Sequence, residues 1–367
     1  MIAKLGIFAG GQYATLEARM LPLAKMLETF GIESYVITPF DWCKILKGKL
    51  GRVLSAVVTY GLKDHLSNLH KNPNVVIIGR TSNLEAYLLT KIIKRKKIRV
   101  IFDLDDALFL PVGSILGVKV RPGSYYLEMM LKNADYVTTN GRYLLSYVRK
   151  FNANSTIIHD PVDTNLFHPR NKVKNHDKIV ISWEGGAPVH HENLAILLKP
   201  LKKIANTYER KVKFKIVSYL GDRFIKNMFG SLERFIEVDY GSERWLSTKQ
   251  FATLLYDSDI MVSPLKEDQW YEGKSALRVG IGMAMGIPVV ASPVGEQKYV
   301  IKHGVNGFLA KNEDEWYTYL KMLIEDENLR KKFGKEGRST AENHLSLEVN
   351  GRKLYKIIEH ILESCSK

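Results

Sequence analysis

The chain has 367 residues, too many for one ordinary hydrophobic core and suitable for two α/β domains. Hydrophobic residues make up 45% and charged residues 25%, which excludes a disordered chain, and no run of about eighteen apolar residues predicts a membrane span. The net charge of +15 favours an anionic partner, such as a phosphorylated substrate, anionic lipid or nucleic acid.

Short β-branched segments alternate with amphipathic stretches, a pattern that predicts βαβ units and mainly parallel sheets. The expected strands of the first half are residues 4–9, 34–38, 74–79, 99–104, 136–140 and 155–160. Those of the second half are residues 178–183, 213–219, 235–240, 259–264 and 288–292, with helices after residue 308. The polar stretch 161–177 is expected to join the halves. The expected fold is α/β, with two Rossmann-like domains facing each other across a cleft.

The first strand is followed by Gly10 and Gly11, and Arg19 lies on the next expected helix. Paired glycines after a strand allow a phosphate or sugar to approach the backbone, but they also make ordinary tight turns. Arg19 is therefore expected either to contact an acceptor phosphate or to pair with a neighbouring carboxylate.

Two groups of cations interrupt the first half. Lys44, Lys47, Lys49 and Arg52 alternate with apolar residues between positions 42 and 54, and six more cations lie between 91 and 99. The first group predicts peripheral attachment to an anionic membrane surface. Its two glycines favour the alternative, an ordinary solvated segment. No RNA-binding or zinc-finger motif accompanies these groups, so nucleic acid is not the expected partner.

Three carboxylates, Asp103, Asp105 and Asp106, close the strand at 99–104. Buried carboxylates are costly unless they are paired, hydrogen-bonded or solvated in a binding site. They could orient or deprotonate a substrate hydroxyl, hold a divalent metal ion, or form a helix cap with buried salt bridges. Strand alternation places Asp103 and Asp105 on one side.

A second pair of glycines, Gly185 and Gly186, follows the strand at 178–183. His190 and His191 come next, at the start of an expected helix. Ligands bind beyond the carboxyl ends of strands in open parallel sheets, so this loop is a candidate site for a phosphate or a sugar.

The segment after residue 269 carries the pattern of an anion site. Gly273 allows close backbone approach, and Ser275 is expected to cap a helix that runs to about residue 285 and stops at Gly286. Lys274 and Arg278 are spaced i, i+4, so they would be neighbours on one helical face. With the helix N–H groups they would stabilise a diphosphate. An ordinary capped helix with a solvated Lys and Arg is the alternative.

Five segments resemble family-four-type glycosyltransferases, the glycosyl transferases group 1 type. Residues 259–316, including WYEGKSALRVGIGMAMGIPVVASPVG, resemble the donor-binding half, and 157–169 (IIHDPVDTNLFHP) resemble the inter-domain stretch. Residues 183–194 (WEGGAPVHHENL) are similar to the start of the second domain. Residues 101–109 (IFDLDDALF) and 17–31 (EARMLPLAKMLETFG) match the acidic loop and the first helix of one branch. The family consists of retaining enzymes of the GT-B fold that use nucleotide sugars.

The resemblance implies a role for each matching position. The implied catalytic residues are Asp105, Asp106 and Glu272; the donor-binding residues are Gly185, Gly186, Gly273, Lys274, Ser275, Arg278 and Glu296; and the acceptor-binding residues are Gly10, Gly11, Arg19 and Asp103. No metal site is expected, because Lys274 and Arg278 already neutralise the diphosphate.

The chain also departs from the family pattern. Ile281 stands where relatives carry the second glutamate of the Glu-x7-Glu motif, and it is expected to face the same way as Lys274 without accepting a hydrogen bond. The Arg and Lys pair of many relatives is replaced by a stretch with His190 and His191. A degenerate, non-catalytic homologue that binds a membrane or a partner is therefore one alternative, and a nucleotide-sugar epimerase is another.

The resemblance implies an acceptor-binding domain at residues 1–168, a nucleotide-sugar-binding domain at 169–345, and a C-terminal helix at 346–367 that packs back on the first domain. The implied activity is transfer of a hexosyl group, with retention, from a nucleotide sugar to a glycan or lipid-linked acceptor in polysaccharide or cell-envelope biosynthesis. Only Cys43 and Cys365 are present, which favours a reducing compartment. We expect a cytoplasmic enzyme on the inner face of the membrane.

Overall fold

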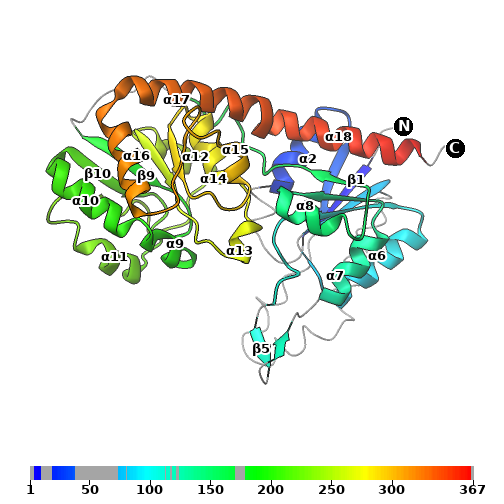
Figure 1. Ribbon diagram of the computed structural model, residues 1–367. Coiled ribbons are helices and arrows are strands. Elements are labelled where there is room, and N and C mark those ends of the chain that lie inside the picture. Colours follow the sequence, from blue (N-terminus) through cyan, green and yellow to red (C-terminus); the bar gives the residue numbers. More distant parts are fainter. Residues whose placement is uncertain are drawn as a thin grey trace. The chain divides into compact units, whose positions relative to one another are not determined.

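The computed structural model describes residues 4–9, 19–37, 73–79, 81–111, 113–115, 118–120, 124–169 and 178–364 (Figure 1). The chain forms two compact units. Unit 1 comprises Met1–Pro161 and Asn350–Lys367, and unit 2 comprises Val162–Val349. The chain thus leaves unit 1 after Pro161 and returns to it at Asn350. The boundary expected from the sequence was at residue 168.

Unit 1 is built on a six-stranded parallel sheet with the order β2-β1-β3-β4-β7-β8. Its strands are β1 (Lys4–Ala9), β2 (Glu33–Ile37), β3 (Val75–Gly79), β4 (Arg99–Leu104), β7 (Tyr136–Thr139) and β8 (Ser155–Ile157). Its helices are α2 (Leu21–Glu28), α6 (Leu84–Arg95), α7 (Ser124–Asn133) and α8 (Arg142–Val148), and a separate antiparallel pair consists of β5 (Gly113–Ile115) and β6 (Val118–Val120). All five residues of β3 are buried, as expected for a central parallel strand covered on both faces.

Unit 2 has a second six-stranded parallel sheet, with the order β11-β10-β9-β12-β13-β14. Its strands are β9 (Ile179–Trp183), β10 (Val212–Ile216), β11 (Glu237–Asp239), β12 (Ile260–Ser263), β13 (Val289–Ala291) and β14 (Phe308–Leu309). Because successive strands run outward from β9 in both directions, the strand order reverses between β9 and β12. Open α/β sheets bind their ligands at such a reversal, outside the carboxyl ends of the strands.

Helices cover the unit 2 sheet and form two buried apolar clusters with it. They are α9 (His191–Ala195), α10 (Leu198–Tyr208), α11 (Arg223–Gly230), α12 (Thr248–Leu255), α13 (Gln269–Glu272), α14 (Leu277–Ala284), α15 (Gln297–Val300), α16 (Glu313–Glu325) and α17 (Glu327–Thr340), with short turns η3 (Ala187–Val189), η4 (Glu209–Lys211) and η5 (Ala341–Leu345). Helix α10 contributes Leu201 and Ile204 to one cluster, and α14 contributes Val279 and Met283 to the other.

Helix α14 lies unusually close to its neighbours because it carries glycines. A Cβ at Gly282 would come within 2.8 Å of Met261 Sδ and 2.9 Å of Val289 Cγ2, so the helix packs directly on β12 and β13. Its end is the predicted one: Gly286 has φ +67°, its N–H donates to Met283 at 3.0 Å, and the next N–H donates to the carbonyl of Gly282 at 2.9 Å. These two bonds form a Schellman motif.

The last helix, α18 (Leu347–Glu363), begins in unit 2 and belongs to unit 1 from Asn350 onward. Gly351 packs against Met26 of α2, and the Tyr355 ring lies 5.0 Å from the ring of Phe30. Asn350 accepts a hydrogen bond from the backbone N–H of His159 at 2.9 Å. Unit 1 is therefore completed by a segment distant in sequence.

Candidate functional site

Two predicted donor-binding segments meet at the strand-order reversal of unit 2. The loop Glu184–Gly185–Gly186 follows β9, and Arg278 lies in the first turn of α14, after β12. Arg278 Nε donates to the backbone carbonyl of Glu184, and its Nη1 lies 3.5 Å from Ser263 Oγ. Segments almost a hundred residues apart in sequence thus form one site, as the sequence pattern predicts.

The Arg278 guanidinium is enclosed but retains some exposure, with 14% of its side-chain surface accessible. Its Cζ lies 5.0 Å from the Trp183 ring centroid, and the Glu184 carboxylate is 3.8 Å from Nε. Burial lowers the pKa of Arg278, while Glu184 acts in the opposite direction. Burial likewise raises the pKa of Glu184. A bound anion would compensate this partly desolvated cation better than Glu184 does at this distance.

Gly185 is required by this arrangement. Its φ is +141°, a value that residues with a side chain rarely adopt, and a Cβ would come 2.6 Å from Arg278 Nη2. Gly186 is different, since a Cβ there would make only ordinary contacts, 3.7 Å from the Trp245 ring and 3.8 Å from Leu220. Trp245 is 67% exposed, so the glycine loop borders an open aromatic surface.

Beside this surface lies a polar hollow of about 500 Å³. It is lined by Tyr219, Gly221, Arg223, Lys226, Asn227 and Glu243. The hollow is connected to the glycine loop through neighbouring backbone, because the N–H of Ala187 donates to the carbonyl of Ser218 at 3.2 Å.

Lys274 lies in the turn between α13 and α14, which differs from the sequence prediction. Gly273 ends α13, and α14 starts only at Leu277, so Lys274 and Arg278 are not i, i+4 neighbours on one helix. Ser275 is not the N-cap residue of α14: that residue is Ala276, and Ser275 Oγ accepts from Leu277 N–H at 3.4 Å.

The Lys274 ammonium lies over Trp270, 4.8 Å from the ring centroid. Its positive charge, with that of Arg278, acts on the His190 imidazole. The pKa of His190 falls to about 3, first through burial and then through Arg278 and Lys274. Both predicted cations therefore act electrostatically on the His190 ring, although Lys274 precedes the helix that carries Arg278.

The remaining family positions in unit 2 are engaged with protein. Glu272 pairs with Lys298 at 2.6 Å, and Glu296 is 2% exposed, with its backbone N–H bonded to the Lys274 carbonyl at 2.9 Å. Ile281 is 6% exposed and belongs to an apolar cluster of unit 2. The expectation that Ile281 faces the same way as Lys274 is wrong, because Lys274 precedes the helix.

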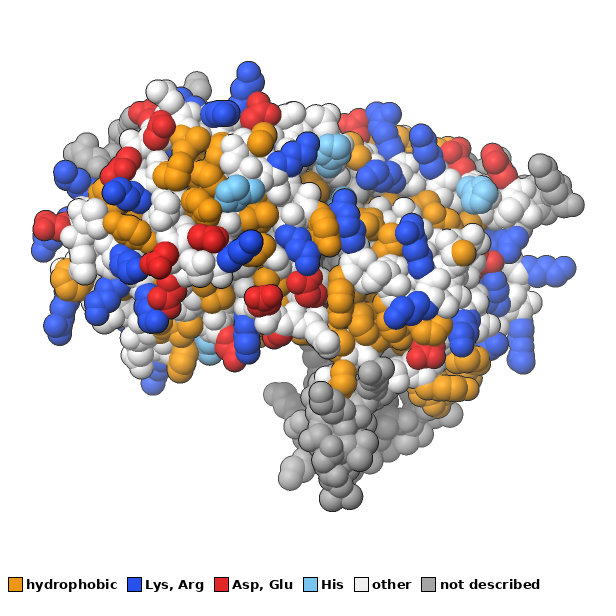
Figure 2. All heavy atoms as spheres, in the orientation of Figure 1, with side chains coloured by type: hydrophobic (Ala, Val, Ile, Leu, Met, Phe, Trp, Pro, Cys, Tyr) orange, Lys and Arg blue, Asp and Glu red, His pale blue; other side chains and the backbone are white. Residues whose placement is uncertain are grey.

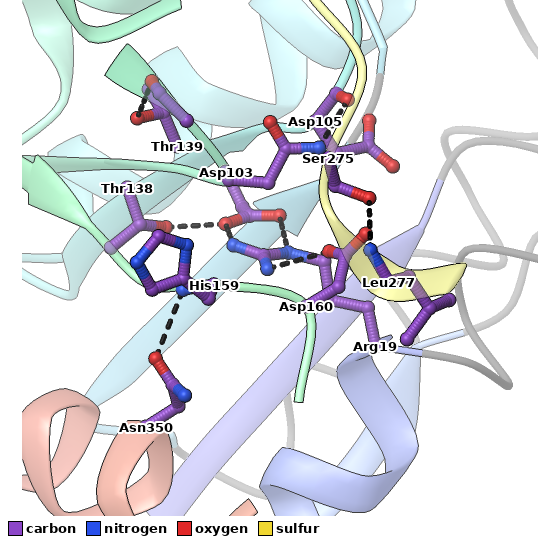
Figure 3. Close-up of polar contacts among 12 residues, drawn as sticks. Arg19, Asp103, Asp105, Thr138, Thr139, His159, Asp160, Ser275, Leu277 and Asn350 are labelled. Carbon is purple, nitrogen blue, oxygen red and sulfur yellow. Dashed lines mark hydrogen bonds and ion pairs between the residues drawn. The ribbon is translucent and has the colours of Figure 1, made fainter. Parts of the chain in front are cut away.

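In unit 1 the acidic strand end is organised by Arg19 (Figure 3). Arg19 is 2% exposed; its Nε and Nη2 donate to the two Asp103 oxygens at 2.9 and 2.8 Å, and Nη1 donates to Asp160 at 2.9 Å. Thr138 Oγ1 donates to Asp103 at 2.5 Å. Arg19 and Asp103 were both predicted to bind the acceptor. They pair with each other, which is the alternative that the sequence left open for Arg19, because a buried guanidinium requires carboxylate partners.

Asp105 and Asp106 follow β4 and are 8% and 3% exposed. Asn140, from the loop after β7, donates from its side chain to the Asp105 backbone carbonyl at 2.7 Å. The Arg19 charge also acts on Asp105. The buried Arg19 charge is therefore close enough to Asp105 for the two to interact electrostatically, and Asn140 anchors the loop backbone. Gly10 and Gly11 lie outside the described residues.

On the face that Figure 2 shows, the described cations do not form a separate patch. Figure 2 shows Lys and Arg side chains interspersed with Asp and Glu on the visible face. In the second cationic group, Lys94 and Arg99 both pair with Asp135, at 2.7 and 2.9 Å. Residues 42–54, the first group, lie outside the described residues, as do Cys43 and Cys365. Among the helices that the structure describes, none has the length and apolarity needed to cross a bilayer.

The described ranges contain no group of three or more His, Cys, Asp or Glu side chains arranged to bind a metal ion.

Comparisons with known proteins give a family match for part of unit 2 and a fold match for nearly the whole chain. Residues 179–326 match the family model described as glycosyl transferases group 1. No curated protein matches the sequence.

Solved structures match nearly the whole chain at low identity. A glycosyltransferase from Rickettsia africae has a TM-score of 0.72 at 17% identity, with 98% of each chain covered. HepE from Anabaena, in complex with UDP and glucose, has a TM-score of 0.68 at 14% identity, covering 98% of this chain and 100% of that one. A protein from Listeria monocytogenes assigned as a UDP-N-acetylglucosamine 2-epimerase has a TM-score of 0.63 at 12% identity, with 98% and 97% covered. Residues 179–326 of unit 2 thus match the glycosyl transferases group 1 model, and the two parallel sheets give the chain the GT-B fold of the solved glycosyltransferases.

Proposed function

We propose that this protein transfers a sugar from a nucleotide-sugar donor to a hydroxyl group of a glycan or lipid-linked acceptor, with retention of anomeric configuration. The observation that carries the proposal is the contact of Arg278 with the loop Glu184–Gly185–Gly186 at the strand-order reversal of unit 2, with the charge of Lys274 acting on the neighbouring His190. That arrangement suits a diphosphate, which needs close backbone approach and compensating cations.

In this proposal the diphosphate lies against Arg278 and the glycine loop, and Lys274 supplies a second positive charge. Charge develops on the diphosphate as the sugar leaves, so cations fixed beforehand stabilise the transition state. The nucleoside extends over Trp245 towards the polar hollow, where Arg223 and Lys226 offer further donors. Two protein cations can neutralise a diphosphate, so we propose that no metal ion is required.

We assign the acceptor to unit 1, with Asp105 or Asp106 orienting its hydroxyl group. Both carboxylates lie at the carboxyl end of a buried strand, the edge at which parallel sheets bind ligands. The acceptor class and attachment to the cytoplasmic face of a membrane rest on the cation-rich sequence at 42–54. Equal recovery of the protein from neutral and anionic liposomes at low salt would contradict that attachment and favour a soluble acceptor.

The test of the proposed function is nucleotide release from a panel of UDP-, GDP- and ADP-sugars, with and without acceptors. We expect one nucleotide to be released, and only when an acceptor is present. A chelator should not change the rate of release. The product should keep the anomeric configuration of the donor. Asp105→Asn and Asp106→Asn should reduce turnover while leaving nucleotide affinity intact. Chelator-sensitive activity would contradict metal independence, and binding of no nucleotide would contradict the proposal itself.

An epimerase is the second candidate, because the Listeria protein shares the fold over nearly the full chain. An epimerase would convert the nucleotide sugar into its epimer without any acceptor. NMR of the panel reactions without acceptor distinguishes the two. An epimerase forms the epimeric nucleotide sugar, whereas a transferase leaves the donor unchanged or slowly hydrolyses it to nucleotide and free sugar.

A further inference from the structure

His190 lies between the glycine loop and α9, and its side chain is held on two sides. Its ring meets the Trp183 ring edge-on at 5.6 Å, and its Nδ1 lies 2.9 Å from Asn193 Nδ2. Either nitrogen of a neutral imidazole can carry the proton, so the bonding of Asn193 determines the tautomer.

Asn193 is fully buried, and its amide orientation is fixed by a backbone contact. Its Oδ1 accepts the N–H of Lys266 at 2.8 Å, so Nδ2 must be the atom facing His190. Nδ2 carries only protons, and it lies 2.9 Å from His190 Nδ1. His190 Nδ1 can therefore only accept, and the imidazole proton lies on Nε2.

The same contact opposes protonation of His190. An imidazolium would turn Nδ1–H towards the Asn193 N–H, and Asn193 cannot flip without turning its own N–H towards the Lys266 N–H. The charged groups that face the ring, Arg278 from α14 and Lys274 from the preceding turn, are both positive. Geometry and charge thus keep the side chain neutral.

We propose that His190 binds a donor phosphate as an uncharged Nε2–H donor, and that Asn193 is the positioning residue that fixes this tautomer. The proposal rests on the function proposed above. The ring is partly exposed, and among the described residues no protein group bonds Nε2. An anionic ligand is indicated because the charged groups that converge on the ring are both cations.

This assignment has a chemical consequence. The site combines two cations with one neutral donor, so the third hydrogen bond does not depend on proton uptake near neutral pH. A histidine that had to be protonated to bind would instead lose the contact as pH rose through its pKa.

The first experiment needs no ligand. Long-range proton–nitrogen NMR of histidine-labelled protein, with the His190 signal assigned from His190→Gln, reports the tautomer directly. We expect the Nε2–H form to persist from about pH 8 to about pH 5, where a free histidine would titrate. An Nδ1–H tautomer, or a titration midpoint within that range, would overturn the proposal.

The second experiment measures UDP and uridine affinity by calorimetry. His190→Phe should weaken UDP about tenfold, as expected for one lost hydrogen bond to a charged group, and should leave uridine unaffected. His190→Gln, whose amide can donate from a similar position, should restore most of the affinity. His191→Gln is the matched control, because His191 bonds Asp222 at 2.5 Å instead and should not affect UDP. Wild-type UDP affinity in a folded His190→Phe variant would refute the contact.

The third experiment converts the positioning residue. In Asn193→Asp, a carboxylate oxygen would accept from Nδ1–H and favour the imidazolium. The measured quantity is the ratio of the UDP affinity of this variant to that of wild type, in which titration of UDP itself cancels. This ratio should rise severalfold as pH is lowered from about 8 to about 6. A constant ratio would contradict the role of Asn193. If wild-type protein binds none of UDP, GDP and ADP, the proposed function fails, whereas the NMR result still tests the tautomer.

Discussion

At the scale of single residues, two of the basic side chains predicted to meet ligands, Arg19 and Arg278, have different environments. Arg19 is surrounded by Asp103 and Asp160 and is compensated by protein alone. Among the described residues, the carboxylate paired with Arg278 is that of Glu184, at the longer distance of 3.8 Å, and the guanidinium remains partly exposed. A buried cation without a close carboxylate is the better candidate for an anionic ligand.

Lys274 should contribute to ligand binding more than to folding. Lys274→Ala is expected to raise the dissociation constant for the nucleotide diphosphate at least tenfold, about 1.4 kcal/mol, with little change in melting temperature. Lys331→Ala is the matched control, because Lys331 is 71% exposed and pairs only with Glu327 on α17. Equal nucleotide affinity in both variants, measured by calorimetry, would remove Lys274 from the site.

The neighbouring glycines of the donor loop should respond differently to the same substitution. Gly185→Ala would strain the backbone and displace Arg278, so we expect a loss of about 1–3 kcal/mol in stability together with weaker nucleotide binding. Gly186→Ala makes only ordinary contacts, so its melting temperature should match that of wild type. A fall in UDP affinity for Gly186→Ala without loss of stability would indicate direct ligand contact. Equal melting temperatures for both variants would contradict the strain at Gly185.

At the scale of elements, helices α14 and α17 are joined by a close backbone approach. A Cβ at Gly334 would overlap the carbonyl oxygen of Gly286, which cannot move without breaking the end of α14. Gly334→Ala should therefore destabilise unit 2 by about 1–3 kcal/mol, measured by thermal unfolding. Gly230→Ala in α11 is the control: no atom lies within 4 Å, so it should be neutral or slightly stabilising. A neutral Gly334→Ala would show that the two helices separate easily.

The predicted strands are present because buried parallel strands carry a strong apolar signal. Strands β1 and β4 begin and end at the predicted residues, and β8 ends three residues early, at Ile157. The antiparallel pair β5–β6 and the two-residue β14 were not predicted, since segments this short have too little pattern.

The start of α14 was predicted wrongly because the short helix α13 was missed. Asp268 caps α13 by accepting the N–H of Tyr271 at 2.9 Å, and an Asp before an aromatic pair was an available signal. The role of Asn193 was also missed. Asn193 lies three residues after His190, a spacing that allows contact at the start of a helix. The sequence does not show which amide atom faces the ring, because the bond from Lys266 N–H determines that orientation.

At the scale of the whole molecule, pH should affect unit 1 through His159. Burial, then Lys353, lowers its pKa to about 4, and a backbone hydrogen bond to Asn140 opposes this. Arg142 and Arg19 lower it further. Between about pH 6.5 and about pH 4 the unfolded chain holds more protons at this side chain than the folded one. The stability of unit 1 should therefore fall as pH drops through this window.

Because His159 is partly exposed, we expect its contribution to be about 1–2 kcal/mol. The measurement is hydrogen exchange of the β4 amides in wild type and in His159→Gln at each pH. Comparing the two proteins separates the effect of His159 from that of carboxylates that titrate in both. The ratio of amide protection in wild type to that in the variant should fall as pH drops from about 6.5 to about 4. His168→Gln, at an exposed position of unit 2, is the control and should leave the ratio constant. A pH-independent ratio for His159→Gln would contradict the assignment.

The return of the chain to unit 1 at Asn350 has a consequence for synthesis on the ribosome. The segment that contacts Met26 and Phe30 is translated only after all of unit 2, a delay of about 10–40 s at typical elongation rates. Until then the apolar face of α2 and the backbone N–H of His159 lack the partners that α18 provides. While unit 2 is being synthesised, the nascent unit 1 therefore exposes the apolar face of α2, the kind of surface that chaperones bind.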